Sequence, residues 1–180
     1  MDNPSNSSNS SKRRFPIGFW ISALGSLVAA IGNTPSVNLP DPIEARDLLL
    51  VGNGLQILGS SIAIENFEQW NIRTGRTIKI IGNGISLRSL LEADDVTALF
   101  LNTQANLIQS VAGAVSLDFA GNLANTPLYN VGVSLLIIGN SLHALFNKIK
   151  LFNMDEGDRL VAVASWIKVV GAIIAALSLM

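Results

Sequence analysis

Residues 51–59 read VGNGLQILG and place two glycines, Gly52 and Gly59, seven positions apart in a stretch without charge. Seven residues make about two turns of an α-helix, so both glycines lie on one stripe of that helix. A glycine inside a helix costs about 1 kcal/mol relative to alanine. Two glycines in phase therefore indicate a gain elsewhere, which the close approach of a neighbouring helix backbone supplies.

The same spacing of small residues recurs in the other apolar segments of the chain. These residues are Gly18, Gly25 and Gly32; Gly75, Gly82 and Ser89; Ala105 and Ala112; Gly132 and Gly139; and Ala164, Gly171 and Ser178. The pattern predicts an all-α bundle of about six related helices that cross at about +20° along small-residue seams. The glycines expected to form the structural seam are Gly25, Gly32, Gly52, Gly59, Gly82, Gly139 and Gly171.

Proline and polar clusters separate apolar segments of roughly 17–25 residues, a length that is ordinary for helices and exceptional for strands. The expected helices cover residues 16–32, 42–66, 74–93, 95–121, 127–150 and 156–179. Residues 20–30 align with residues 166–176, which indicates an internal repeat. We expect residues 1–14 to be a disordered polar and basic tail and residues 15–180 to be a single helical-repeat domain.

Two of the helix starts carry capping signals. Asp41 precedes Pro42, and Glu44 follows three residues after Asp41, which is the pattern of a capping box. Thr126 before Pro127 repeats the arrangement of a cap followed by proline. These signals place helix starts near residues 42 and 127.

The basic residues Lys12, Arg13 and Arg14 precede an apolar run over residues 15–31, an order that resembles a signal peptide or a signal anchor. The run ends in small residues that also suit a cleavage site. Because the run aligns with residues 166–176, we expect it to be kept as a helix of the bundle.

The composition limits the classes of partner. The chain has a net charge of −1, 14% charged residues and a mean hydropathy of +0.43. A net charge this small gives no field to attract nucleic acid, so we expect no nucleic-acid partner. The chain has no cysteine and hence no disulfide or thiolate chemistry. Soluble domains carry about 25% charged residues, so this surface either consists of neutral polar side chains or does not face water.

Asn53, Asn83 and Asn140 each directly follow a seam glycine. Amides beside a seam can form hydrogen bonds between helices and fix their register, as a buried asparagine does in coiled coils. On this interpretation the three residues are register amides. The alternative interpretation is a neutral helix face in contact with water.

The sequence allows two interpretations of what surrounds the bundle, lipid or water. Long uncharged runs and small-residue seams suit a membrane, but polar residues such as Lys79 and Gln109 would be costly against lipid. Apolar residues of the third helix are periodic, and we expect Ile78, Ile81 and Ile85 to form a stripe toward the core. This favours amphipathic middle helices, with first and last helices that insert, dock or self-associate. The protein would then be cytoplasmic or membrane-associated.

No group of residues indicates a reaction. The chain has one histidine, His143, and one histidine without cysteine makes no zinc site. The acidic residues lie mostly at segment ends, where they cap helices. The stretch Gly82-Asn83-Gly84 lacks the Lys-Ser/Thr pair of a phosphate-binding loop. We therefore predict a non-enzymatic protein without catalytic, cofactor-binding or metal-binding residues.

The pattern Gly-Asn-x-Leu-Gln-x-x-Gly, present at residues 52–59, resembles a family of uncharacterised repetitive helical proteins of spore-forming Gram-positive bacteria. Residues 20–35 are similar to the usual start of that family. The third segment departs from the pattern, with Arg88 and Ser89 where leucine and glycine are expected. The resemblance implies a helical-repeat architecture and implies no activity.

Three functional hypotheses follow. The first is a structural or interaction protein, a helical bundle that self-associates or docks on a membrane or cell-surface layer. The second is an integral membrane bundle that is channel- or holin-like. The third is a carrier of an apolar ligand, which requires a cavity inside the bundle.

Overall fold

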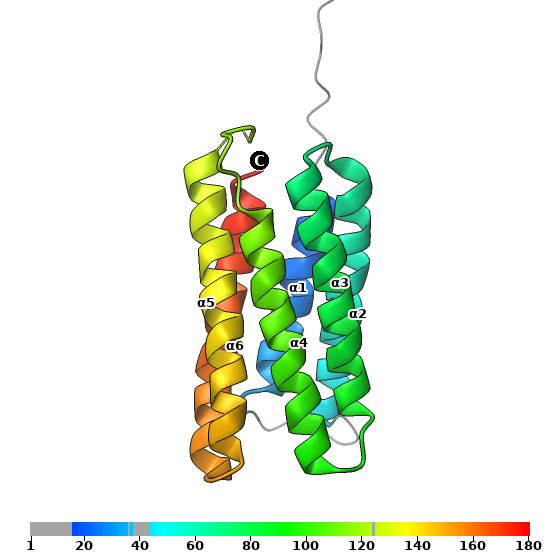
Figure 1. The fold of residues 1–180 in the computed structure, drawn as a ribbon, viewed down its shortest axis with the longest axis vertical. Coiled ribbons are helices and arrows are strands. Elements are labelled where there is room, and N and C mark those ends of the chain that lie inside the picture. The colour runs from blue at the N-terminus through cyan, green and yellow to red at the C-terminus, as the bar shows by residue number, and fades with distance from the viewer. Residues whose placement is uncertain (1–15, 36, 38–43, 124) are drawn as a thin grey trace, which may run out of the picture.

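The computed structural model describes residues 16–35, 37, 44–123 and 125–180, and within them it contains six α-helices and no strand. This confirms the predicted all-α bundle. The helices are α1 (Ile17–Gly32), α2 (Ala45–Asn66), α3 (Trp70–Leu90), α4 (Asp95–Ser116), α5 (Thr126–Lys150) and α6 (Met154–Leu177). Consecutive helices run antiparallel, as short connections require (Figure 1).

The six helices form a closed ring. Each helix packs against its neighbours in the sequence, α1 packs against α6, and helices on opposite sides make no close backbone contact within the described residues. The α4–α5 connection and the C-terminus lie at one end, here named the C-terminal end (Figure 1). A ring of this kind has a central axis that only side chains can fill.

Paired helices approach most closely at the seam glycines. An ideal Cβ atom on Gly25 of α1 would lie 2.6 Å from the carbonyl oxygen of Gly52 on α2, and one on Gly52 would lie 2.7 Å from that of Gly25. Gly132 and Gly171 show the same reciprocal contact between α5 and α6, at 2.8 and 2.7 Å. A side chain at any of these positions would overlap the partner backbone.

The remaining predicted seam glycines also face the partner helix of their hairpin. Gly32 faces Ala45, Gly59 faces Ser22, Gly82 faces Ala105 and Gly139 faces Ala164. Gly54 and Gly84, which lie off the seam, would have no neighbouring atom within 4 Å of an added Cβ. The contribution of the seam to stability stays a prediction. It can be tested by comparing substitutions at seam glycines with substitutions at Gly54 or Gly84.

Two helix boundaries at the C-terminal end differ from the prediction. α3 begins at Trp70 rather than at residue 74, because Gly75 is a helical residue packed on α4 and not part of a turn. α4 ends at Ser116 rather than at residue 121. The chain leaves the helix there because the Asp118 N–H donates to Asn130 Oδ1 on α5, at 2.9 Å.

The predicted caps also shift. Asp41 and Pro42 lie outside the described residues, and the described start of α2 has the Glu44 N–H donating to the Asp47 carboxylate at 3.1 Å. α5 is capped by Asn125 rather than by Thr126, with Pro in its first turn. Each start still satisfies free backbone N–H groups with a side-chain oxygen.

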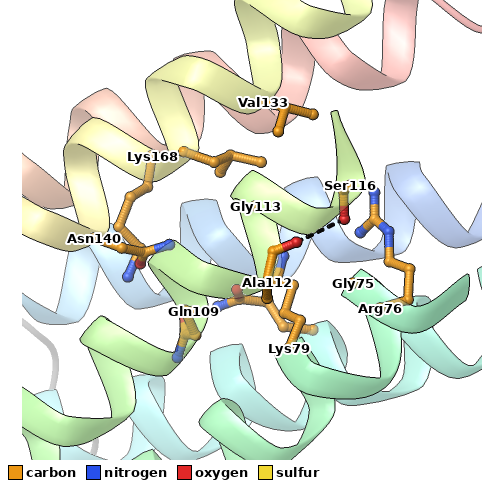
Figure 2. A pocket seen from close by; sticks show the side chains of 12 residues that line it. Gly75, Arg76, Lys79, Gln109, Ala112, Gly113, Ser116, Val133, Asn140 and Lys168 are labelled. Carbon is orange, nitrogen blue, oxygen red and sulfur yellow. Dashed lines mark hydrogen bonds between the residues drawn. The ribbon is translucent and has the colours of Figure 1, made fainter. Parts of the chain in front are cut away.

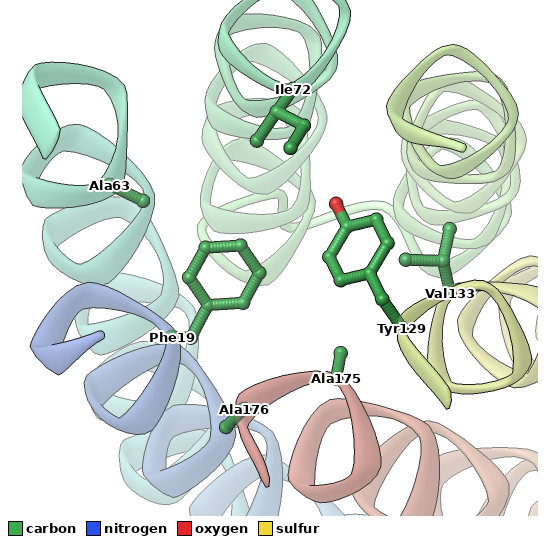
Figure 3. Close-up of a cluster of buried hydrophobic side chains, with 7 residues drawn as sticks. All are labelled: Phe19, Ala63, Ile72, Tyr129, Val133, Ala175 and Ala176. Carbon is green, nitrogen blue, oxygen red and sulfur yellow. The ribbon is translucent and has the colours of Figure 1, made fainter. Parts of the chain in front are cut away.

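The apolar core is small and lies toward the C-terminal end. Phe19, Ile72 and Tyr129, near the starts of α1, α3 and α5, converge on the axis (Figure 3). The rings of Phe19 and Tyr129 meet edge to face with centroids 6.1 Å apart. Ala63 and Ala175 complete the contact from α2 and α6. Apolar side chains thus close one end of the axis and leave its remaining length to other residues.

We predict that Gly25→Leu lowers the free energy of unfolding by several kcal/mol, because over-packing a close helix contact forces the backbones apart. Gly54→Leu is the matched control, since its added side chain enters open space and replaces a poor helix former. Unfolding midpoints followed by circular dichroism check both variants. Equal midpoints for Gly25→Leu and Gly54→Leu would contradict the seam.

Candidate functional site

The side chains beside the seam divide between the outside of the helical ring and its axis. One residue is a rotation of about 100°, so the residue before a seam position and the residue after it face opposite ways. Seven of the preceding residues are 48–54% exposed: Leu24, Val51, Leu58, Ile81, Val131, Ile138 and Val170. Six of the following residues are buried and polar, Ser26, Asn53, Ser60, Arg76, Asn83 and Asn140, while Val133 and Ala172 are buried and apolar. Large apolar groups therefore face out at these positions, and most of the polar groups face inward.

The predicted apolar stripe toward the core of α3 is wrong. Ile81 is 54% exposed, and Ile78 and Ile85 are only partly buried. The buried face of this helix includes Arg76 and Asn83. The prediction assumed that the apolar face of an amphipathic helix packs inward, whereas here the face rich in small and polar residues does.

The three predicted register amides all lie inside the helical ring, but none forms a hydrogen bond to another helix within the described residues. Asn53 Nδ2 donates to the Leu49 carbonyl of its own helix at 2.8 Å. Asn83 is fully buried with both amide atoms unpartnered, and Asn140 Oδ1 also has no partner. Asn53 and Asn140 instead line cavities on the axis.

Two small cavities adjoin along the axis. The first has a volume of about 30 Å³ and is lined in part by Gln56, Arg76, Lys79, Gln109, Asn140 and Lys168 (Figure 2). The second, also of about 30 Å³, is lined in part by Asn53, Gln56, Ser86, Asn106, His143 and Lys168. Because Gln56 and Lys168 line both, the two cavities are neighbours, and in the first the polar groups lie beside apolar ones such as Val133 and Leu136.

The first cavity concentrates positive charge. Arg76 is 5% exposed, and its guanidinium carbon lies 3.7 Å from the centre of the Phe19 ring, a cation–π contact. Lys168 Nζ donates to Asn106 Oδ1 at 3.3 Å. Within the described residues, neither these two cations nor Lys79 forms an ion pair with a carboxylate. No side chain therefore balances their charge by direct contact.

Asp118 is a buried carboxylate in the α4–α5 connection, and its hydrogen-bond partners lie in and beside that connection rather than among the three basic side chains of the cavity. Its Oδ2 accepts from the Leu123 N–H at 2.9 Å and from the Thr126 hydroxyl at 2.8 Å. Burial alone would raise the pKa of Asp118, but these hydrogen bonds outweigh it and hold that pKa below its usual range. The charged carboxylate thus anchors the connection at the C-terminal end.

His143 lies on the second cavity. Its side chain is 4% exposed, and neither ring nitrogen has a hydrogen-bond partner. Within the described ranges no group of three histidine, cysteine, aspartate or glutamate side chains comes together that could hold a metal. His143 therefore stands on the axis as a single imidazole among amides and hydroxyls.

The sequence analysis did not identify Arg76, Lys79 and Lys168 as neighbours. A signal for one of them was present, because Arg76 follows Gly75 as Asn53 and Asn83 follow their own seam glycines. Lys79 and Lys168 do not directly follow a seam glycine, so the pattern gives no sign of them. Only the closure of the ring through the α1–α6 contact brings α3 and α6 to the same cavity.

Comparison with known proteins shows one match. A family of unknown function, DUF6944, matches residues 15–176, which agrees with the expected resemblance to an uncharacterised family. Neither the curated proteins nor the solved structures include a significant match to the chain. The family match covers nearly the whole sequence, and the chain therefore belongs to DUF6944, a family of unknown function.

Proposed function

We propose that this protein is a non-enzymatic integral membrane protein whose six helices span the bilayer and enclose a polar axis, as in channel-like proteins. The observation that carries the proposal is an inverted distribution of polarity. The middle of the helical ring is apolar outside and polar inside, which is the reverse of what a bundle in water requires.

Large apolar side chains are exposed on every helix of the ring. One from the middle of each is Leu24, Leu58, Ile81, Leu107, Ile138 and Val170, and these are 48–54% exposed. Monomeric soluble proteins rarely expose contiguous apolar patches above a few hundred Å². Docking or self-association through one face would cover part of this surface, whereas lipid covers all of it.

Charge supports the same arrangement. α1 carries no charged residue, and α2 carries none between Asp47 and Glu65. The mid-helix cations Arg76, Lys79 and Lys168 line the axial cavity. The 22 residues of α2 extend about 33 Å, which matches a hydrocarbon layer of about 30 Å.

Two exposed hydroxyl groups on the outer surface bond to their own helix. Ser61 Oγ donates to the Ile57 carbonyl at 3.0 Å, and Thr77 Oγ1 donates to the Arg73 carbonyl at 3.0 Å. Within a bilayer no water is present to satisfy such groups, so bonds of this kind make them compatible with lipid.

Three of the described helices are long and apolar enough to cross a membrane by length and composition: residues 45–65, 126–150 and 155–177. α1 is apolar but has 16 residues. α3 and α4 have lower hydropathy because their polar side chains, including Arg76, Asn83 and Gln109, face the axis. Hydropathy averages the two faces of a helix, and lipid contacts only one of them.

Alkaline carbonate washing of membranes that contain the full chain should leave the protein in the pellet, because spanning helices resist extraction. The fractions can be compared by immunoblotting. Release into the supernatant with a helical circular-dichroism spectrum would overturn the proposal.

Ile138→Arg should destabilise the protein in membranes by about 2.5–3.5 kcal/mol, the cost of a charged side chain at the centre of a spanning helix. Leu151→Arg is the matched control, because Leu151 is 50% exposed, close to the 48% of Ile138, but lies at the end of α5. The measurement is the midpoint of unfolding by sodium dodecyl sulfate in mixed micelles. Equal, small effects of both substitutions would indicate that Ile138 faces water.

A further inference from the structure

Three basic side chains, Arg76, Lys79 and Lys168, line one small cavity on the axis, and within the described residues no carboxylate pairs with them. An arginine keeps its proton in proteins, so Arg76 carries its charge whatever the state of Lys79 and Lys168. A buried charge without a partner is strongly unfavourable. The cation–π contact with Phe19 compensates one face of the guanidinium only.

Polar groups without partners face the same cavity. Arg76 Nε, Gln109 Oε1 and Asn140 Oδ1 are unpartnered, and these side chains are 3–5% exposed. Buried polar groups in folded proteins are almost always hydrogen-bonded. Gln109 Oε1 and Asn140 Oδ1 are acceptors, and they can receive from a lysine ammonium or a water in the cavity, whereas Arg76 Nε–H is a buried donor that an anion can satisfy.

The size of the cavity limits the ligand. About 30 Å³ holds roughly two waters, since one water needs roughly 10–15 Å³. A monatomic anion fits this space.

We propose that the first cavity binds a small inorganic anion of the chloride class, held by Arg76, Lys79 and Lys168. Basic side chains without a paired carboxylate, the unpartnered Arg76 Nε–H and a volume of a few waters point to this ligand. Lys168 also lines the second cavity, so the anion site adjoins that cavity.

The test uses the purified full chain in dodecylmaltoside micelles. Thermal unfolding is followed by circular dichroism while sodium chloride replaces sodium gluconate at constant ionic strength, since gluconate is too large for the cavity. A ligand that binds only the folded state raises the unfolding temperature with saturation. We expect such a rise with chloride, and a flat response of the wild-type chain would overturn the proposal.

Lys168→Gln should raise the half-saturating chloride concentration at least about tenfold, because it removes one charge-assisted contact. Lys148→Gln, the same substitution at an exposed end of α5, should titrate like the wild-type chain. A wild-type midpoint in Lys168→Gln would overturn the proposal. If Lys168→Gln does not fold, Lys79→Gln takes its place with the same expected shift.

The anion site goes beyond the proposed membrane location and does not depend on it. A protein that carbonate releases but that still responds to chloride would contradict only the membrane proposal. A protein that stays in the membrane pellet and shows no chloride response would contradict only the anion site.

Discussion

The contact between the backbones of Gly25 and Gly52, with its counterpart at Gly132 and Gly171, is the constraint on which the other features depend. Without a Cβ atom the two helices of a hairpin approach until carbonyl oxygens face the partner backbone. The contact fixes the rotation of each helix about its own axis. It therefore decides which residues face outward and which face the centre of the ring.

Because the rotation of each helix is fixed, the order of residues around each seam glycine decides which side chains lie outside the ring and which lie inside it. Leu24 and Ser26 flank Gly25, and Val51 and Asn53 flank Gly52, so that one neighbour of each glycine is exposed and the other is buried. Around a closed ring, the exposed neighbours make an apolar outer surface and the buried neighbours make a polar axis. In the proposed membrane-spanning bundle the outer surface would contact lipid, and the axis would hold the proposed anion.

The sequence was sufficient to predict the helices, because periodic small residues and capping signals are local. It was insufficient for the direction of the helix faces. Ile81 was expected in the core because apolar faces turn inward in water, but it is 54% exposed. Under the membrane proposal this face would contact lipid, and no local sequence pattern identifies the surrounding solvent. The cavity with Arg76 and Lys168 could not be predicted for another reason, since it depends on how α3 and α6 meet when the ring closes.

The central claim is that the outward apolar residues contact lipid. The chain has no cysteine, so single nitroxide labels can be placed at Leu58→Cys, Leu107→Cys and, at the start of α2, Arg46→Cys. Electron paramagnetic resonance in liposomes then compares collisions with oxygen, which concentrates in lipid, and with a water-soluble nickel complex. The account predicts high oxygen and low nickel accessibility at residues 58 and 107 and the opposite at residue 46. Nickel accessibility at residues 58 and 107 equal to that at residue 46 would contradict it.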